Sequence, residues 1–485
     1  MWYLCYFYHR LLDYRRPEVE ALAKLFGGSA KFEWKLPPHH HLDSPFHFIW
    51  LPSDDIASKV ANRSILVKCM LELWGQGYSY EELKTSVQTF PEEQKLPYLG
   101  AESTFRIVVD TFGKVLSSDE QRERIESFSY IPFKGRVDLR NADYRFWLIE
   151  TDDQFSKNGL PPTVQRTLFF GREVGVADRK LLPTFSLSKR KYLGPTAMDA
   201  EIAFLMANQA LVQPGKLVYD PFVGTGSILV AASHFGAMTM GADIDIRVVR
   251  NGRGPDCNVW SNFKQYDLPL PISLIRADNN LPPWRGDLQE IFDAIICDPP
   301  YGVRAGGRKS GGRKLLKGVK GPYVIPDEKR KDHIPSTAPS TAPYSLVECV
   351  HDLLDVAARL LVMGGRLVFF YPVAVDEDAK DIFPDHKCFT LVSHSEQILS
   401  TRYSRCLLTM EKTARYTADV AEMARKKHLE FRENHGMLTE ESRENGTLRS
   451  KVFSPADNLE VSSGLSEMNI KCDKDWKPKY RSKYV

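Results

Sequence analysis

Four short apolar segments in the second half of the chain each end in an aspartate. They are residues 217–220 (LVYD), 238–243 (MTMGAD), 273–278 (SLIRAD) and 291–298 (IFDAIICD). Short apolar runs of this kind are typical of the buried strands of a parallel α/β sheet. Because parallel strands present their carboxyl ends at one edge of the sheet, where α/β folds bind ligands, we expect Asp220, Asp243, Asp278 and Asp298 to line one crevice.

The tetrapeptide Asp298-Pro299-Pro300-Tyr301 closes the last of these segments. The carboxylate of Asp298 and the carbonyl of Pro299 can accept hydrogen bonds from an exocyclic amine. Two prolines remove backbone donors and stiffen the turn, and the ring of Tyr301 offers a face on which a base can stack. The residues therefore predict a loop for chemistry at an amine. For an isolated tetrapeptide, the alternative is a Pro-Pro turn in which Tyr301 only packs.

A glycine turn follows the first segment and leads into a helical segment. Gly224 and Gly226 can adopt positive φ and allow a ligand to approach the backbone, and Ser227 is the predicted N-cap of the helix. The turn is not the full GxGxxG fingerprint, and the chain has no GxxxxGK[ST] phosphate loop, which argues against NAD and ATP.

The carboxylates after the second and third segments suit a nucleoside. Asp243 and Asp245 are placed to hold ribose hydroxyls, and Asp278 is placed to accept a hydrogen bond from an adenine amine. Any one of these residues alone is more readily explained as a solvated loop acid. Acids at the ends of all four strands favour a nucleoside site.

These motifs together resemble the class I S-adenosylmethionine-dependent amino-methyltransferases, which carry an Asp-Pro-Phe-x-Gly-x-Gly turn and an [Asp/Asn]-Pro-Pro-[Tyr/Phe] loop. Residues 190–201 (RKYLGPTAMDAE) and 298–306 (DPPYGVRAG) further resemble the catalytic subunit of the eukaryotic and archaeal tRNA guanosine-10 N2-methyltransferases. The similarity runs from about residue 1 to about 435 and returns in the terminal KPKYRSKYV.

The resemblance implies methyl transfer from S-adenosyl-L-methionine to the exocyclic N2 of guanosine 10 in tRNA, without a metal. It implies two partners, tRNA and a small zinc-binding activator subunit. The catalytic residues that it implies are Asp298, Pro299, Pro300 and Tyr301. The residues implied to bind the methyl donor are Asp220, Pro221, Gly224, Gly226, Asp243, Asp245, Asp278 and Thr196.

The predicted fold is a Rossmann-like class I methyltransferase sheet preceded by an α+β N-terminal and THUMP-like region. We expect an N-terminal α+β subdomain (1–60), a THUMP-like RNA-binding domain (61–165), a linker (166–192), the methyltransferase domain (193–435) and a disordered charged tail (436–485). A basic insert at about 303–344 has a composition that predicts disorder.

The first half of the chain alternates between predicted strands and helices. Strands are expected at residues 2–8, 46–50, 105–109, near 137 and at 144–149, and helices at 17–26, 118–128 and, for the most part, 54–74. The module suits RNA binding, but a scaffold that only packs on the enzyme is the alternative. Its basic residues can contact RNA or be merely solvated: Arg106, Lys114, Lys134, Arg136, Arg140 and Arg145.

Composition narrows the cellular setting. The net charge is only +3, so nucleic-acid binding depends on local patches. Eight cysteines without a CxxC pair favour reduced thiols over disulfides or a zinc site, which predicts a cytoplasmic protein with a possible nuclear pool. The apolar start (WYLCYFY) is too short for a membrane span or a signal peptide, so no membrane partner is expected.

Two other functions fit part of the pattern. The same tetrapeptide chemistry serves methylation of a protein glutamine amide or of adenine N6 in DNA, although such an enzyme does not need the nearly 190 residues that precede the methyltransferase segment here. A non-catalytic RNA-binding protein is the third possibility, and the intact acids argue against it. For the activator, the strand at 241–243 is a candidate pairing edge if it borders the sheet.

Overall fold

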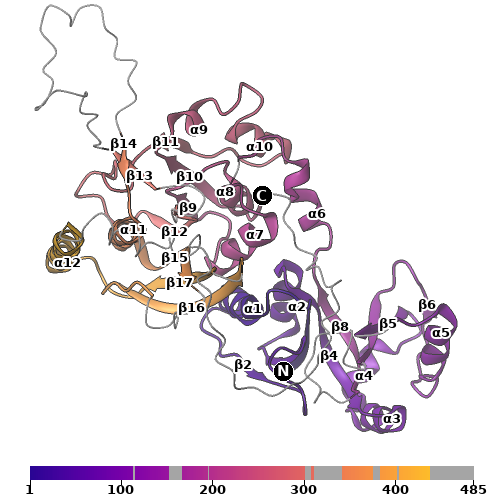
Figure 1. Cartoon of the computed structure of the whole chain (residues 1–485). Helices are drawn as coiled ribbons and strands as arrows, with labels where there is room; N and C mark the ends of the chain where they lie inside the picture. The colour runs from indigo at the N-terminus through magenta and orange to yellow at the C-terminus, as the bar shows by residue number, and fades with distance from the viewer. Residues whose placement is uncertain are drawn as a thin grey trace, which may run out of the picture.

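The computed structural model describes residues 1–112, 115–151, 166–194, 196–300, 307–310, 341–374, 383–400 and 403–436. These residues form an eight-stranded sheet from the first part of the chain and a seven-stranded sheet from the second part (Figure 1). Tyr301, Lys114, most of the basic insert and the charged tail lie outside the described residues. Within the described residues, no helix is long and apolar enough to cross a membrane.

The first sheet has the strand order β2-β3-β1-β4-β8-β7-β5-β6. Its strands are β1 (Trp2–Phe7), β2 (Glu33–Lys35), β3 (Phe46–Trp50), β4 (Val67–Gly77), β5 (Thr104–Phe112), β6 (Arg136–Val137), β7 (Tyr144–Thr151) and β8 (Leu168–Val176). The helices beside it are α1 (Leu12–Gly27), α2 (Asp54–Arg63), α3 (Tyr80–Thr89), α4 (Glu92–Lys95), η1 (Leu96–Tyr98) and α5 (Ser118–Glu126). All pairs are antiparallel except those of β5 with β6 and β7.

The prediction of helix over most of residues 54–74 is wrong in its second half. Helix α2 ends at Arg63, and β4 begins at Val67 and pairs with β1 and β8 in the middle of the sheet. Leucine, methionine and glutamate in β4 favour a helix locally, but hydrogen bonds on both sides and burial outweigh that preference. Residues 168–176, expected in a linker, likewise form β8 because β4 and β7 flank them.

The second sheet has the order β11-β10-β9-β12-β15-β17-β16, with β9 to β12 and β15 parallel and β17 antiparallel to both neighbours. Its strands are β9 (Leu217–Asp220), β10 (Met238–Asp243), β11 (Ser273–Arg276), β12 (Phe292–Cys297), β15 (Leu361–Ala374), β16 (Phe389–Ile398) and β17 (Tyr403–Lys412). A small hairpin joins β13 (Arg308–Ser310) to β14 (Thr341–Pro343). The remaining helices are α6 (Leu181–Phe185), η2 (Leu187–Lys189), α7 (Ala200–Gln209), α8 (Ser227–His234), α9 (Ile246–Arg250), α10 (Val259–Gln265), α11 (Leu346–Leu360) and α12 (Ala418–Gly436).

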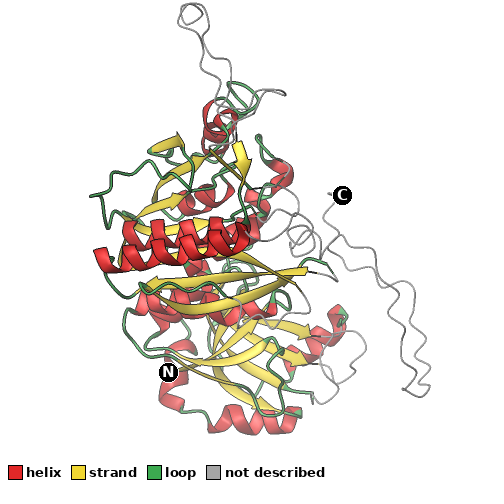
Figure 2. Ribbon diagram, turned by 60° about the vertical axis from the view of Figure 1, so that its left-hand side comes forward, coloured by secondary structure: helices red, strands yellow, loops and turns green. Residues whose placement is uncertain are grey.

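Helices cover both faces of the second sheet (Figure 2). Successive strand residues point to opposite faces, so Ala294 and Ile296 join one core cluster with α7 and α8, whereas Ile295 and Cys297 join another with α11. The chain runs outward from β9 through β10 to β11 and then returns to place β12 on the other side of β9. This reversal opens a crevice at the carboxyl ends of β9 and β12. The arrangement confirms the predicted class I fold.

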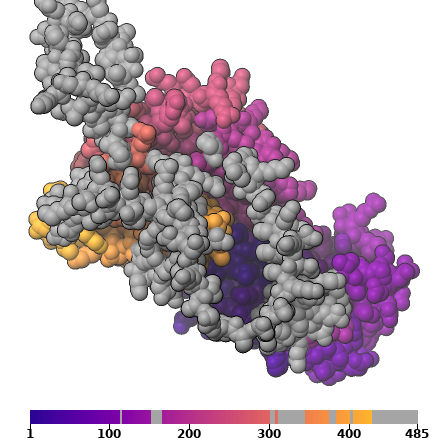
Figure 3. Space-filling view, in the orientation of Figure 1, coloured from indigo at the N-terminus to yellow at the C-terminus, as the bar shows by residue number. Residues whose placement is uncertain are grey.

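The two sheets are joined through α1, which packs against α7 and β16. One core cluster continues from β1 and α1 into α7 and α8. In the space-filling view, the indigo N-terminal surface lies between the orange C-terminal strands and the violet part of the first sheet (Figure 3). The N-terminal module is therefore packed on the second sheet and is not a loosely tethered unit.

A buried carboxylate lies at this junction. Glu18 of α1 is fully buried and accepts hydrogen bonds from Ser64 Oγ (2.6 Å), Ile65 N (2.7 Å), Leu66 N (3.0 Å) and Asn208 Nδ2 of α7 (2.8 Å). Four donors compensate for the loss of water around the charge. Glu18 thus ties the loop after α2 to the second half of the chain.

We expect Glu18→Ala to lower the free energy of unfolding by about 3 kcal/mol, because several buried donors lose their acceptor. Denaturant unfolding followed by fluorescence measures the change. Glu33→Ala in the exposed strand β2 is the control and should shift stability by no more than about 0.5 kcal/mol. Equal stability of the two variants would show that the Glu18 network does not hold the halves together.

Candidate active site

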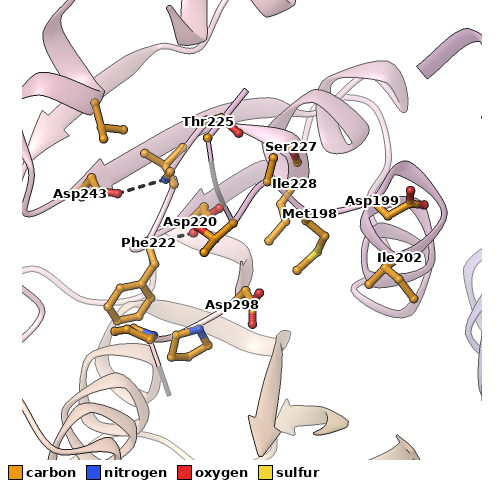
Figure 4. A pocket seen from close by; sticks show the side chains of 18 of the residues that line it. Met198, Asp199, Ile202, Asp220, Phe222, Thr225, Ser227, Ile228, Asp243 and Asp298 are labelled. Carbon is orange, nitrogen blue, oxygen red and sulfur yellow. Dashed lines mark hydrogen bonds between the residues drawn. The ribbon is translucent and has the colours of Figure 1, made fainter. Parts of the chain in front are cut away.

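A cavity of about 1740 Å³ opens at the carboxyl ends of the parallel strands. Asp220, Asp243, Asp278 and Asp298 all line it, so the fold brings together the four acids that end separate segments of the sequence. Figure 4 shows three of them, with Asp220 between Asp243 and Asp298. The cavity exceeds the usual range for a single small ligand and has room for a nucleoside and a second base.

The glycine turn after β9 forms one wall. Gly224 (φ 49°) and Gly226 (φ 82°) adopt left-handed conformations that favour glycine. Gly224 N donates to Asp243 Oδ2 (3.1 Å), whereas Gly226 does not line the cavity and packs so closely on α10 that a Cβ would lie 2.7 Å from Val259 Cγ1. The prediction of Ser227 as N-cap is wrong, because Gly226 takes that position and Ser227 Oγ accepts a hydrogen bond from Arg190.

Two carboxylates face this wall. Asp220 is buried and accepts a hydrogen bond from Phe222 N (2.9 Å), and Asp243 Oδ1 accepts one from Asp245 N (2.9 Å) (Figure 4). Burial raises the pKa of both Asp220 and Asp243 above the ordinary value. A pair of desolvated acids of this kind favours a ligand that brings hydroxyl donors or positive charge.

The other residues predicted to bind the donor differ in their surroundings. Asp245 caps α9 and forms an ion pair with Arg247 (2.6 Å), and the hydrogen bonds from Arg247 lower the pKa of Asp245. Asp278 is buried and accepts a hydrogen bond from Asn280 N (2.9 Å). Pro221 and the exposed Thr196 also line the cavity. The carboxylate of Asp245 is therefore occupied by contacts with α9, while the carboxylate of Asp243 faces the Gly224 turn.

Asp298 lies at the opposite wall, directly after β12 and beside Pro299 and Pro300, which also line the cavity. Its side chain is 27% exposed, and Arg405 Nη1 lies 3.4 Å from its Oδ2. Its Oδ1 is buried and has no hydrogen-bond partner among the described residues. Burial raises the pKa of Asp298 to about 6, and the positive charge of Arg405 limits the rise.

Several lining residues were not anticipated from the sequence. Arg405 on β17 and Ile398 at the end of β16 border the Asp298 wall, and Leu11 and Asp13 reach it from the start of α1. Tyr344, after the hairpin, lines the cavity near Asp278. The one available signal was Arg405 directly before the largely apolar run at 406–410 (CLLTM). The rest come from segments that no local motif connects to the crevice.

The donor set suits a nucleoside that carries a positive charge. Carboxylates at the ends of β9 and β10 and the backbone of the Gly224 turn can take hydroxyl and cationic groups, and Asp298 keeps an unused acceptor for a second substrate. In the described part of the chain, no group of three histidine, cysteine or acidic side chains is placed to hold a metal ion.

Comparisons with known proteins agree with this site. Residues 1–179 match the Tmrp11 THUMP N-terminal domain family, and residues 188–319 match the RMKL-like methyltransferase domain family. The chain is 38% identical over 417 residues to the tRNA (guanine(10)-N(2))-methyltransferase TRMT11 of Homo sapiens, covering 84% of this chain and 87% of the human protein. The Mus musculus protein of the same name is 37% identical, covering 84% and 86%. The solved structure of TrmN from Thermus thermophilus shares 16% identity and covers 85% of this chain and 100% of its own, with a TM-score of 0.36, which is too low to add to the assignment.

A class I S-adenosylmethionine-dependent methyltransferase is the class of enzyme that this sheet and crevice define. Both halves of the chain match the curated relatives along most of their length. The chain belongs to the TRMT11 family of tRNA (guanine(10)-N(2))-methyltransferases.

Proposed function

We propose that this chain transfers a methyl group from S-adenosyl-L-methionine to the exocyclic N2 of guanosine 10 in tRNA and forms N2-methylguanosine. The observation that carries the proposal is the position of Asp298, whose unpartnered Oδ1 belongs to the same cavity as the Gly224 turn and Asp243. In this proposal, the amine acceptor and the nucleoside site share one cavity. Membership of the TRMT11 family supports the choice of tRNA and of guanosine 10.

At the donor end, the chain's own residues provide shape and charge. We assign the ribose hydroxyls to Asp243 and the adenine amine to Asp278, because these acids end the second and third strands of the sheet. Gly224 and Pro221 let the ligand approach the backbone turn. We assign Asp220, which also lines the cavity, to the positively charged part of the methyl donor. S-adenosylmethionine supplies a methyl group activated by its positive sulfonium.

At the acceptor end, the difficulty is that guanine N2 is a poor nucleophile, because its lone pair is delocalised into the ring. Hydrogen bonds from N2–H to Asp298 and to the Pro299 carbonyl orient the amine and increase electron density on nitrogen. Much of the rate then comes from alignment of N2 with the methyl carbon. In the net reaction, N2 gains the methyl group, the carbon–sulfur bond breaks with its electron pair left on sulfur, and one N2 proton is released.

The target base has to leave its stack to enter the cavity, which costs a few kcal/mol. Stacking on Tyr301, a residue outside the described part of the chain, is proposed to recover about 1–3 kcal/mol. The eight-stranded N-terminal module is proposed to hold the tRNA, with Arg136 and Arg140 among its exposed basic residues.

The decisive experiment measures the transfer of labelled methyl groups from S-adenosylmethionine to tRNA, DNA and protein fractions, followed by nucleoside analysis. We expect label in tRNA as N2-methylguanosine at position 10. Label in DNA as N6-methyladenine or in protein glutamine would support the alternative substrates. Binding of tRNA without any transfer would identify a non-catalytic RNA-binding protein.

We also propose that the enzyme works in the cytoplasm with a small zinc-binding activator subunit. The strand at 241–243 belongs to β10, which is internal, so it is not the pairing edge; the border strand is β11. Apolar side chains around β11 are exposed: Met238 (48%), Leu270 (47%), Ile272 (61%) and Leu281 (66%). The opposite edge, β16, contacts α1, where Ser395 Oγ donates to the Asp13 carbonyl (3.1 Å), but it also exposes Leu391 (40%), Val392 (45%) and Ile398 (75%). We place the activator at β11, because exposed apolar side chains at the edge of a sheet suit a partner subunit.

We expect the chain alone to be poorly soluble and weakly active, and co-expression with the activator to restore both properties. Ile272→Lys should weaken co-purification of the activator about tenfold or more, because it places a charge within the apolar contact. Val347→Lys, on α11 and 45% exposed, is the matched control. A monomeric chain with full activity would contradict the activator proposal. The proposed methyl-transfer reaction would still stand.

A further inference from the structure

The guanidinium of Arg405 is held on three sides at the acceptor wall. Its Nε donates to Gln397 Oε1 (2.8 Å), its Cζ lies 3.8 Å from the centre of the Phe370 ring, and its Nη1 lies 3.4 Å from Asp298 Oδ2. Gln397 and Arg405 are direct partners in the β16–β17 register, and Phe370 belongs to β15 on the other side. Three strands of the sheet thus fix one charge, and the side chain is only 14% exposed.

Arg405 contacts only one of the two carboxylate oxygens of Asp298. Oδ2 faces Arg405, while Oδ1 has no hydrogen-bond partner among the described residues. Arg405 lies on the antiparallel strand β17, about a hundred residues after Asp298. Arg405 is largely withdrawn from water and pairs with a carboxylate that lines the cavity, which makes it a candidate functional residue.

From this geometry we infer that Arg405 is a positioning residue for methyl transfer, which holds Asp298 Oδ2 and keeps the carboxylate ionised so that Oδ1 accepts the amine of the target base. The inference rests on the proposed function and assigns to it a residue outside both sequence motifs. Arginine suits this task because its guanidinium group stays charged at every physiological pH. The planar group can also stack on Phe370 while it pairs with Asp298.

Other ionisable groups near Asp298 act in the opposite direction or stay neutral. Asp220, at the end of β9, is a like charge when ionised, and the neighbouring thiol of Cys297 has a pKa raised by burial. Arg405 is the group whose charge lowers the pKa of Asp298 against the effect of burial, and the resulting value is about 6. Without Arg405, Asp298 would take up a proton at a higher pH and become a weaker acceptor for an amine.

The test measures single-turnover methyl transfer to tRNA by the full chain, with its activator if required, from pH 5 to 9. The parent should lose activity with a midpoint near pH 6 as Asp298 becomes protonated. In Arg405→Gln the midpoint should rise by about one pH unit or more, which cuts the rate about fivefold or more at pH 6 and about twofold or more at pH 7, and restores most of it above pH 8.5. Affinity for S-adenosylmethionine should stay within about twofold, since Arg405 lies at the acceptor wall.

Three further variants separate positioning from folding. Arg405→Lys retains the charge and should keep the midpoint near that of the parent, so a shift as large as in Arg405→Gln would overturn the inference. Arg425→Gln removes a charge from the exposed side of α12 and is the matched control. In an Asp298→Asn background, Arg405→Gln should have no further effect on rate, because the group it positions is gone.

The outcomes distinguish this inference from the proposed function. An equal loss at every pH in Arg405→Gln, with an unmoved midpoint, would reduce Arg405 to a structural residue while Asp298 keeps its role. Full activity of the Asp298 variants would instead remove Asp298 from the mechanism, and with it this inference, while methyl transfer to tRNA would stand. If Arg405→Gln does not fold, two other measurements test whether Arg405 positions Asp298. They are the pH midpoint of Arg405→Lys and the rate of Arg405→Lys combined with Asp298→Asn.

Discussion

Asp298→Ala is expected to abolish methyl transfer, with a loss of at least about a hundredfold in single-turnover rate, while binding of S-adenosylmethionine and tRNA stays largely intact. Asp298 is the proposed acceptor for the amine, and other residues of the cavity are proposed to hold the donor, so its removal should affect the amine and not the donor. A loss of this size is typical for a group that contacts the reacting atom and accepts its hydrogen bond. Rates of label transfer, with affinities from calorimetry, measure both effects.

Two variants sharpen this prediction. Asp298→Asn keeps the shape and one acceptor but loses the charge, so it should retain more activity than alanine and far less than the parent. Asp287→Ala, in the exposed loop before β12, is the control and should leave the rate unchanged. Activity of Asp298→Ala within about threefold of the parent would remove Asp298 from the mechanism.

Asp243→Ala is expected to weaken S-adenosylmethionine binding by about 1.5–3 kcal/mol, or roughly 10- to 150-fold in affinity, because a charged acceptor for the ribose hydroxyls is lost. Calorimetry on the full chain measures the change. Asp243 Oδ2 also accepts a hydrogen bond from Gly224 N, so alanine loosens the turn as well. Asp243→Asn, which can still accept from Gly224, isolates the contribution of the charge.

Asp245→Ala is the comparison for this second prediction. Its carboxylate is occupied by Arg247 and caps α9, so a smaller loss of affinity is expected. Should Asp243→Ala bind S-adenosylmethionine as the parent does while Asp245→Ala does not, the ribose contact would have to be reassigned to Asp245.

The local sequence pattern predicted an element correctly where the apolar residues of that element are the ones that the fold buries. The apolar runs at 217–220, 238–243 and 292–297 predicted β9, β10 and β12 because parallel strands are buried on both faces and so are apolar at nearly every position. Helix α11 instead has a single apolar face, which packs on the sheet. The segment that became β4 misled the prediction, because its leucine and methionine suit a helix and its burial comes from β1 and β8.

The amino-acid sequence alone was sufficient for the fold class, the family and the four aspartates of the crevice. Each aspartate ends a strand or lies within two residues of its end, so local pattern and the geometry of parallel sheets place them at one edge. The order of the strands, the free edge at β11 and the contact between Arg405 and Asp298 depend on pairings between segments far apart in the chain. Hydrogen bonding between β12, β15 and β17 brings that arginine to Asp298, and the pairing follows from packing of the whole sheet, which no local run of residues encodes.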